Sequence, residues 1–211
     1  MKRGIACIGG DGPERESCAH YCASADLIAA ADSGLHRAES AHIIPDCILG
    51  DMDSLDDLSH LDRYAPGKII RYPADKDYTD TELALQWLWD QGCTETWLLG
   101  GGGGRLDHSL GIRLLFDRER HPDRWITAHE DVHIIESGTS FSDSPHPGTI
   151  ISVFSCGSGP WRAESEGLHW SLNGIQWEPG FFGLSNRAEG TFRIRAVTGN
   201  FLVIIPLKVL S

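Results

Sequence analysis

The sequence predicts an α/β N-terminal domain with a mainly parallel sheet, followed by an all-β C-terminal sandwich domain. Before about residue 126, short apolar runs alternate with longer segments of helical periodicity, which is typical of a parallel sheet covered by helices. After that point, strand-like segments are separated by Gly, Pro, Ser and Asn, and helical spacing disappears. Because the pattern changes only once, we expect one domain over residues 1–126 and a second over residues 127–211.

Five apolar runs in the first domain are typical of buried strands. They comprise residues 4–8, 27–31, 47–49, 68–72 and 96–99. Between the last two, the apolar side chains of segment 83–91 fall on one helical face. Thr79 and Glu82 have the spacing of a helix N-terminal capping box, so a helix should begin there, with Glu82 in a structural role. Another helix is expected to begin near Asp107.

The second domain contains four clear strand-like segments. They comprise residues 150–154, 168–172, 191–197 and 201–207. Arg193 and Arg195 alternate with Phe192 and Ile194, which is the pattern of a strand with one buried face. These segments are sufficient for a small sandwich or barrel.

Composition excludes several classes of protein. The chain has 211 residues, 41% hydrophobic and 23% charged, as expected for a folded globular protein. A net charge of −12 argues against nucleic acid as a partner. The longest apolar run, residues 201–205, is too short to span a membrane, and the N-terminus lacks the pattern of a secretory signal. Six cysteines without a Cys-x-x-Cys pair favour a reduced, cytoplasmic protein.

Glycine and polar residues follow every expected strand of the first domain. These segments are residues 9–12, 32–34, 50–54, 75–80 and 100–108. In a parallel sheet the carboxyl ends of the strands meet at one edge, where ligands bind. The sequence therefore predicts one composite site rather than five unrelated turns.

Carboxylates are concentrated in two of these segments. Asp51 and Asp53 alternate, so on an extended stretch both side chains would point the same way. Together with Asp80, and with Asp77 in support, they would suit Mg²⁺, which prefers oxygen ligands and bridges to phosphates. The alternative is a solvated acidic surface, which we favour for three other residues. These are Asp56, Asp57 and Asp62.

The glycine run at residues 100–104 permits close approach of the backbone to a ligand. It lacks the Lys-Ser/Thr ending of a P-loop and is a weak motif by itself. Arg105 lies just before the expected helix and can bind a phosphate through two parallel hydrogen bonds. Its presence strengthens the interpretation of the glycine run as a phosphate-binding motif. His108 is either a helix-start residue or a ligand contact. Together these features predict a site for Mg²⁺ and a polyphosphate.

At these motifs the sequence resembles the thiamine pyrophosphokinase family. The matching elements in the first domain are Asp32-Ser33-Gly34, Gly50 to Ser54, Asp75 to Asp80 and Arg105 to His108. In the second domain, residues 167–172 and Gly183-Leu184-Ser185-Asn186 resemble the family pattern. Ser33 departs from the usual glycine. The motifs are ordered over nearly the whole chain.

The resemblance implies an ATP-dependent diphosphotransferase that converts thiamine to thiamine diphosphate and releases AMP. In this reading Mg²⁺ is bound by Asp51, Asp53 and Asp80, and Asp77 and Asp107 are also catalytic. A base, if the reaction uses one, is either Asp107 or one of the metal-bound aspartates. The implied ATP-binding residues are Asp32, Ser33, Lys76, Gly102, Gly103, Gly104, Arg105 and His108. Ser185 and Asn186 would bind thiamine, with Trp170 or Trp177 as a candidate stacking ring. The resemblance also implies a homodimer, while the charge and hydropathy already described argue against nucleic acid and membrane partners.

Two alternatives remain open. The first is a Mg²⁺-dependent pyrophosphokinase or phosphohydrolase that acts on another small alcohol or nucleotide, and the Ser185-Asn186 motif argues against it. The second is a nucleotide sensor without turnover. The complete set of carboxylates argues against a sensor, because binding alone needs fewer of them.

Overall fold

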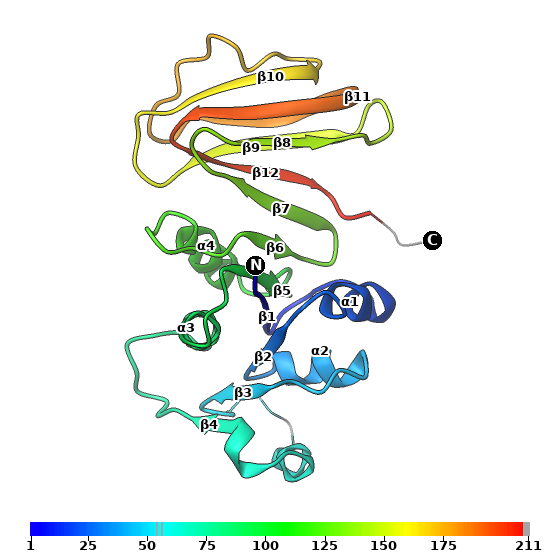
Figure 1. Ribbon diagram of the computed structural model, residues 1–211, viewed down its shortest axis with the longest axis vertical. Coiled ribbons are helices and arrows are strands. Elements are labelled where there is room, and N and C mark those ends of the chain that lie inside the picture. The colour runs from blue at the N-terminus through cyan, green and yellow to red at the C-terminus, as the bar shows by residue number, and fades with distance from the viewer. Residues whose placement is uncertain (54, 56, 209–211) are drawn as a thin grey trace. The chain divides into compact units, whose positions relative to one another are not determined.

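The computed structural model describes residues 1–53, 55 and 57–208 (Figure 1). Ser54, the last residue of the expected Gly50–Ser54 motif, and Asp56 lie outside the described residues. The described chain forms two compact units. Unit 1 comprises Met1–Ile112 and Pro122–His129, and unit 2 comprises Arg113–His121 and Glu130–Lys208.

Unit 1 is built on six parallel strands. They are β1 (Arg3–Cys7), β2 (Leu27–Ala31), β3 (Cys47–Gly50), β4 (Ile69–Arg71), β5 (Glu95–Leu99) and β6 (Arg124–Ile126), in the order β6-β5-β1-β2-β3-β4. Every registered pair among them is parallel. Each of the five expected runs coincides with a strand. Sequence patterning missed β6, because only one of its three residues is fully buried.

The helices of unit 1 connect these strands. They are α1 (Arg15–Cys22), α2 (Gly34–Ser40), α3 (Asp80–Asp90) and the 3₁₀ helices η1 (Leu58–Arg63) and η2 (Pro66–Lys68). α1 and α2 lie on one side of the strands and α3 on the other (Figure 1). The capping box is confirmed, since the Thr79 hydroxyl accepts from the Glu82 N–H while Glu82 accepts from the Thr79 N–H. No helix in the described part of the chain is both long and apolar enough to cross a bilayer.

α4 (Leu106–Leu115) begins in unit 1 and continues across the unit boundary. Unit 2 otherwise consists of antiparallel strands. They are β7 (Glu130–Ile135), β8 (Ser140–Asp143), β9 (Ile150–Cys156), β10 (Arg162–Leu168), β11 (Phe182–Thr198) and β12 (Asn200–Pro206). The first part of β11 pairs with β9, and its later part pairs with β8 and β10. The chain therefore combines parallel and antiparallel strands with helices. This mixture agrees with the predicted α/β domain followed by an all-β domain.

The expected strand at residues 168–172 is wrong. β10 ends at Leu168, and His169 and Trp170 form a bend. Gly167 has a φ of 70°, which breaks the extended backbone. The amide side chain of Asn186, rather than a neighbouring strand, then bonds both backbone groups of Trp170. The apolar residue Leu172 is buried all the same, so burial without a strand produced the misleading pattern.

Gly183, Ser185 and Asn186 are residues typical of a Gly-rich turn between strands, and the sequence predicts a turn here. That prediction is wrong, because Ser185 and Asn186 lie inside β11. The pairing of β11 with β9 shifts register between Gly183 and Asn186, and Ser185 has a φ of 57°. This irregularity is a bulge in a long strand. It explains why small and polar residues here look like a turn in the sequence.

Candidate functional site

Three carboxylates meet beside the carboxyl ends of β2 and β3. Asp32 follows β2, Asp51 follows β3, and Asp80 is the first residue of α3. Each can offer one oxygen such that the three oxygens lie within 4.8 Å of one another. Because β2 and β3 are neighbours in the sheet, the loops that follow them come together.

Asp32 is the most confined of the three. Its side chain is buried, and its backbone has a φ of 48°, which is unusual for a residue other than glycine. Within the described part of the chain, its Oδ1 atom is buried without a hydrogen-bond partner. A buried carboxylate oxygen without a partner is costly, so this atom fits the role of a ligand to a cation.

Lys76 supplies positive charge to the cluster. Its Nζ atom lies 2.8 Å from Asp51 Oδ2 and 3.3 Å from Asp80 Oδ1. The hydrogen bond from Lys76 lowers the pKa of Asp51. Burial raises the pKa of Asp80, and the nearby charge of Lys76 only partly opposes this effect. Burial would lower the pKa of Lys76, but its bonds to the two carboxylates outweigh burial and raise it.

One ammonium group cannot neutralise three carboxylates. Asp32, Asp51 and Asp80 therefore retain excess negative charge in a partly buried site. Their donor set consists only of hard carboxylate oxygens, which matches Mg²⁺ better than a softer metal. The chemistry of the residues and the unpartnered oxygen of Asp32 thus both fit a magnesium ion.

The basis for pairing Asp53 with Asp51 is wrong, because the stretch between them is not extended. Met52 is buried and has a φ of 66°, so the backbone turns there. Asp53 is exposed, and its N–H donates to Asp51 Oδ1 at 3.1 Å. The three-carboxylate cluster contains Asp32 instead. Asp77 is also exposed, in the bend that precedes α3.

Sequence reasoning missed the place of Asp32 among the carboxylates and assigned it only to ATP. One signal was available in the sequence. Asp32 directly follows a fully apolar strand, just as Asp51 closely follows the next strand along the chain. Adjacent strands in a parallel sheet bring such residues together regardless of their separation in sequence.

The glycine run lies beside the loop that follows β1. The Gly101 N–H donates to the Gly9 carbonyl at 2.7 Å, and Gly102 pairs with Asp11 as an isolated bridge. Gly103 and Gly104 are exposed and both have positive φ. The two loops thus come together as expected, with exposed backbone at residues 103–104.

Ser33 sits between β2 and α2, immediately before the helix. Its side chain makes no capping hydrogen bond to α2. A Cβ built on Gly9 would lie 2.5 Å from Ser33 Oγ, so the hydroxyl packs closely against the loop after β1. Ser33 is therefore at the same edge of the sheet as the carboxylates.

Arg105 and Asp107 form an exposed ion pair at the start of α4. The guanidinium bonds both carboxylate oxygens, at 3.1 and 2.6 Å, and the arginine side chain is 72% exposed. The His108 N–H also donates to Asp107, while the histidine itself is exposed. The bond from Arg105 lowers the pKa of Asp107, so the carboxylate is a weak proton acceptor while the pair is intact. The same fork of donors can instead hold a phosphate.

Ser185 and Asn186 belong to unit 2 and differ in exposure. Ser185 is exposed, whereas Asn186 is buried and its amide bonds the N–H and carbonyl of Trp170 at 3.1 and 2.6 Å. Trp170 is 52% exposed and Trp177 only 6%. Of the two candidate stacking rings, only Trp170 is therefore exposed. The Arg187 guanidinium lies over this ring, 5.5 Å from its centroid, and the His169 ring packs against it at 4.5 Å between centroids.

We predict that Gly101→Ala is much more disruptive than Gly104→Ala. Both glycines have positive φ, so both variants carry backbone strain of about 1–2 kcal/mol. A Cβ at Gly101 would also lie 2.4 Å from Ile112 Cδ1 and 2.9 Å from Ile8 Cδ1, whereas Gly104 has open space. Overpacking adds roughly 1–3 kcal/mol. Thermal melts of both variants test this, and equal melting temperatures would contradict the packing of Gly101.

Comparisons with known proteins give a consistent result. The family described as "Thiamin pyrophosphokinase, catalytic domain" matches residues 18–124, just over half of the chain. A thiamine pyrophosphokinase of Bacillus subtilis (strain 168) is 38% identical over 88 residues, which span 40% of this chain and 41% of that protein.

Solved structures are similar over nearly the full length. A thiamine pyrophosphokinase from Bacillus subtilis has a TM-score of 0.80 at 22% identity, covering 99% of this chain and 100% of that one. A thiamin pyrophosphokinase family protein from Enterococcus faecalis has a TM-score of 0.77 at 22% identity, with the same coverage. At these identities the likeness establishes the fold.

Proposed function

The chain belongs to the thiamin pyrophosphokinase family, and we propose that it transfers the diphosphate group of ATP to thiamine, giving thiamine diphosphate and AMP. The observation that carries this proposal is the cluster of Asp32, Asp51 and Asp80 with Lys76. It lies within the region matched by the family, and its donor set suits a magnesium–polyphosphate complex.

In the proposed reaction, the hydroxyl oxygen of the thiamine side chain attacks the β-phosphorus of ATP. A new oxygen–phosphorus bond forms, and the bond from the β-phosphorus to the oxygen bridging the α-phosphate breaks. AMP leaves with that oxygen, and the hydroxyl proton passes to a base or to solvent. Such transfers depend mainly on positioning and charge stabilisation.

We assign each side chain a role on this basis. Asp32, Asp51 and Asp80 would hold Mg²⁺, which when bound neutralises phosphate charge. Asp53 remains a proposed ligand of Mg²⁺, bound directly or through water. Asp77 remains a proposed supporting residue of the same metal site. Lys76 holds Asp51 and Asp80 in place and offers positive charge to a phosphate.

A second group would bind the triphosphate. Gly103 and Gly104 offer exposed backbone, and Gly102 anchors the loop to Asp11. Arg105 would exchange Asp107 for a phosphate, which would free Asp107 to accept a proton. Ser33 and His108 complete the proposed ATP-binding set.

We assign ATP and Mg²⁺ to an α/β domain of residues 1–126, and thiamine to a β-sandwich domain of residues 127–211. The exposed ring of Trp170 can stack on an aromatic substrate. Asn186 would act by fixing the Trp170 backbone, and the exposed Ser185 would contact thiamine directly.

We also propose a cytoplasmic homodimer. α4 exposes Leu106, Leu110 and Leu114 at four-residue spacing, which gives one apolar stripe, and β11 separately exposes Phe182 and Leu184. Burial of such surfaces against a second copy would remove them from water. All six cysteines are free and buried, which suits a reducing compartment.

Incubation with ATP and Mg²⁺, with and without thiamine, tests the activity. We expect AMP and thiamine diphosphate in equal amounts, and neither without thiamine. AMP or ADP without thiamine would indicate a phosphohydrolase. AMP formed only with a different small alcohol would indicate another pyrophosphokinase. Binding of ATP with no product under any condition would indicate a sensor.

We predict that Arg105→Lys lowers the proposed activity by roughly tenfold or more, since lysine keeps the charge but loses the planar fork. The stability should change little, because the Arg105 side chain is 72% exposed. Steady-state kinetics with varied ATP, alongside a thermal melt, check both statements. Near-native kinetics would restrict Arg105 to its surface ion pair with Asp107.

A further inference from the structure

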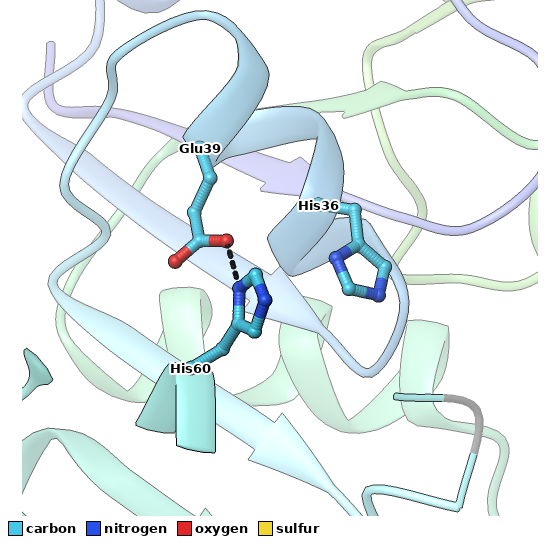
Figure 2. A group of neighbouring side chains, drawn as sticks. All are labelled: His36, Glu39 and His60. Atoms are coloured by element: carbon cyan, nitrogen blue, oxygen red, sulfur yellow. Dashed lines mark hydrogen bonds and ion pairs between the residues drawn. The ribbon is translucent and has the colours of Figure 1, made fainter. Parts of the chain in front are cut away.

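A second cluster of metal-ligating side chains lies in unit 1 between α2 and η1. It consists of His36, Glu39 and His60 (Figure 2). Each residue can offer one ligand atom such that the three atoms lie within 4.8 Å of one another. None of the three belongs to the carboxylate cluster described above.

Local structure explains why these side chains meet. His36 and Glu39 are three residues apart on α2, so they project from the same face of the helix. His60 comes from η1, and its Nδ1 atom lies 2.6 Å from Glu39 Oε2. The two imidazole rings are 5.6 Å apart between centroids and nearly perpendicular.

Neighbouring groups orient the carboxylate. The Tyr64 hydroxyl donates to Glu39 Oε1 at 3.2 Å, and Arg63 Nη1 lies 3.6 Å from the same oxygen. Outer contacts of this kind fix a metal-binding carboxylate, and here they leave Oε2 facing His60.

A hydrogen-bonded pair of Glu39 and His60 would explain only part of this arrangement. Within the described chain, the Nε2 atom of His36 is buried and has no hydrogen-bond partner. A cation bound by the His36 ring would give this nitrogen a partner.

We propose that His36, Glu39 and His60 bind a divalent transition-metal cation of the zinc class. Two imidazole nitrogens and one carboxylate oxygen are a donor set that zinc prefers, whereas Mg²⁺ selects oxygen ligands. Three protein ligands leave a fourth position for water or a small anion. The site is therefore chemically distinct from the carboxylate cluster at Asp32, Asp51 and Asp80.

The position of this site in the chain has a structural consequence. α2 begins two residues after Asp32, and η1 begins seven residues after Asp51. Beneath both elements, Leu35 and Leu61 belong to one buried apolar cluster. A bound metal would link the same two elements through coordinate bonds and stabilise unit 1 against unfolding.

Titration with Co²⁺ as a spectroscopic substitute for zinc tests the proposal, using tag-free, reduced, full-length protein. We expect about one equivalent to bind, with visible absorption bands from nitrogen and oxygen ligands and no intense near-ultraviolet band from thiolate. Zn²⁺ should displace the Co²⁺ and raise the melting temperature. His60→Gln and Glu39→Gln should each weaken binding by at least about tenfold.

Two control variants make the result specific. His146→Gln removes an exposed histidine of unit 2, and Asp80→Asn alters the carboxylate cluster, so both should retain the cobalt spectrum. Circular dichroism verifies that the His60 and Glu39 variants are folded, and His36→Gln provides a third, independent ligand deletion. The proposal is overturned by absent Co²⁺ binding, by a thiolate spectrum, or by undiminished binding in folded variants of the cluster.

Discussion

Asp51→Asn and Asp80→Asn are each expected to reduce thiamine-dependent AMP formation by on the order of a hundredfold or more. Both carboxylates belong to the cluster that fits Mg²⁺, and each replacement removes one charged oxygen ligand. The stabilisation of the protein by Mg²⁺ and ATP together should disappear in both variants, because a ligand stabilises only the state that binds it. Steady-state assays and thermal melts with and without Mg²⁺–ATP provide the measurements.

The two variants should differ in stability without metal. The pKa of Asp51 is lowered by Lys76, so its charge stabilises the fold above the unfolded-state pKa, and this contribution is lost as the pH falls. Asp51→Asn should therefore cost about 1–3 kcal/mol at neutral pH. The pKa of Asp80 is raised by burial, so its ionisation opposes folding at neutral pH. Asp80→Asn should melt higher than Asp51→Asn.

Lys76→Met offers a matched control, since it removes the common partner of both carboxylates while preserving a long side chain. The Lys76→Met variant should be less stable than wild type at neutral pH without metal. Added Mg²⁺ should make this difference in stability smaller. Equal ligand-induced shifts in wild type and both aspartate variants would contradict the proposed metal cluster. Equal melting temperatures for the two variants would contradict the different environments of Asp51 and Asp80.

Strands β1 to β5 and the capping box of α3 were predictable because their signals are local, whereas the three-residue strand β6 was not predicted. Buried parallel strands are short apolar runs, and the Thr79–Glu82 box is a spacing of three residues. The grouping of polar segments at one edge was also predictable, since it depends only on strand direction. These features required no knowledge of side-chain contacts.

The membership of the carboxylate cluster could not be obtained from local spacing. Asp51 and Asp53 look equivalent in sequence, but the positive φ of Met52 turns the chain between them. Asp32 joins the cluster because β2 and β3 are adjacent, which is a property of the sheet. The contact of His36 and Glu39 with His60 likewise joins segments separated by more than twenty residues.

The same limit applies to Asn186, whose contacts lie far along the chain. The sequence motif predicts that Asn186 contacts a substrate. In the structure, its side-chain amide is instead hydrogen-bonded to the N–H and carbonyl of Trp170, sixteen residues away. Its Oδ1 atom also accepts from the Arg187 N–H at 2.8 Å. Asn186 is therefore placed to position the exposed Trp170 ring rather than to leave its amide free for a ligand.

Asn186→Ala is accordingly expected to act on both stability and thiamine binding. Removal of the amide leaves the Trp170 N–H and carbonyl without their partner in a partly buried place, at a cost of about 1–3 kcal/mol. Trp170 would then lose its fixed orientation. Thiamine affinity should fall by roughly tenfold or more, while ATP affinity and the Mg²⁺ requirement stay nearly unchanged, because the residues proposed to bind phosphate belong to unit 1.

Ser185→Ala is the matched comparison in the same strand, because it removes one exposed hydroxyl and none of the contacts to Trp170. We expect a native melting temperature and a several-fold loss of thiamine affinity, as for one lost hydrogen bond of about 0.5–1.5 kcal/mol. Calorimetric titrations of thiamine and ATP into both variants, with thermal melts, separate direct contact from positioning. If Asn186→Ala lowers the melting temperature while thiamine affinity is unaltered, Asn186 serves only the fold. An equal loss of thiamine and ATP affinity in both variants would instead remove thiamine from the proposed role of unit 2.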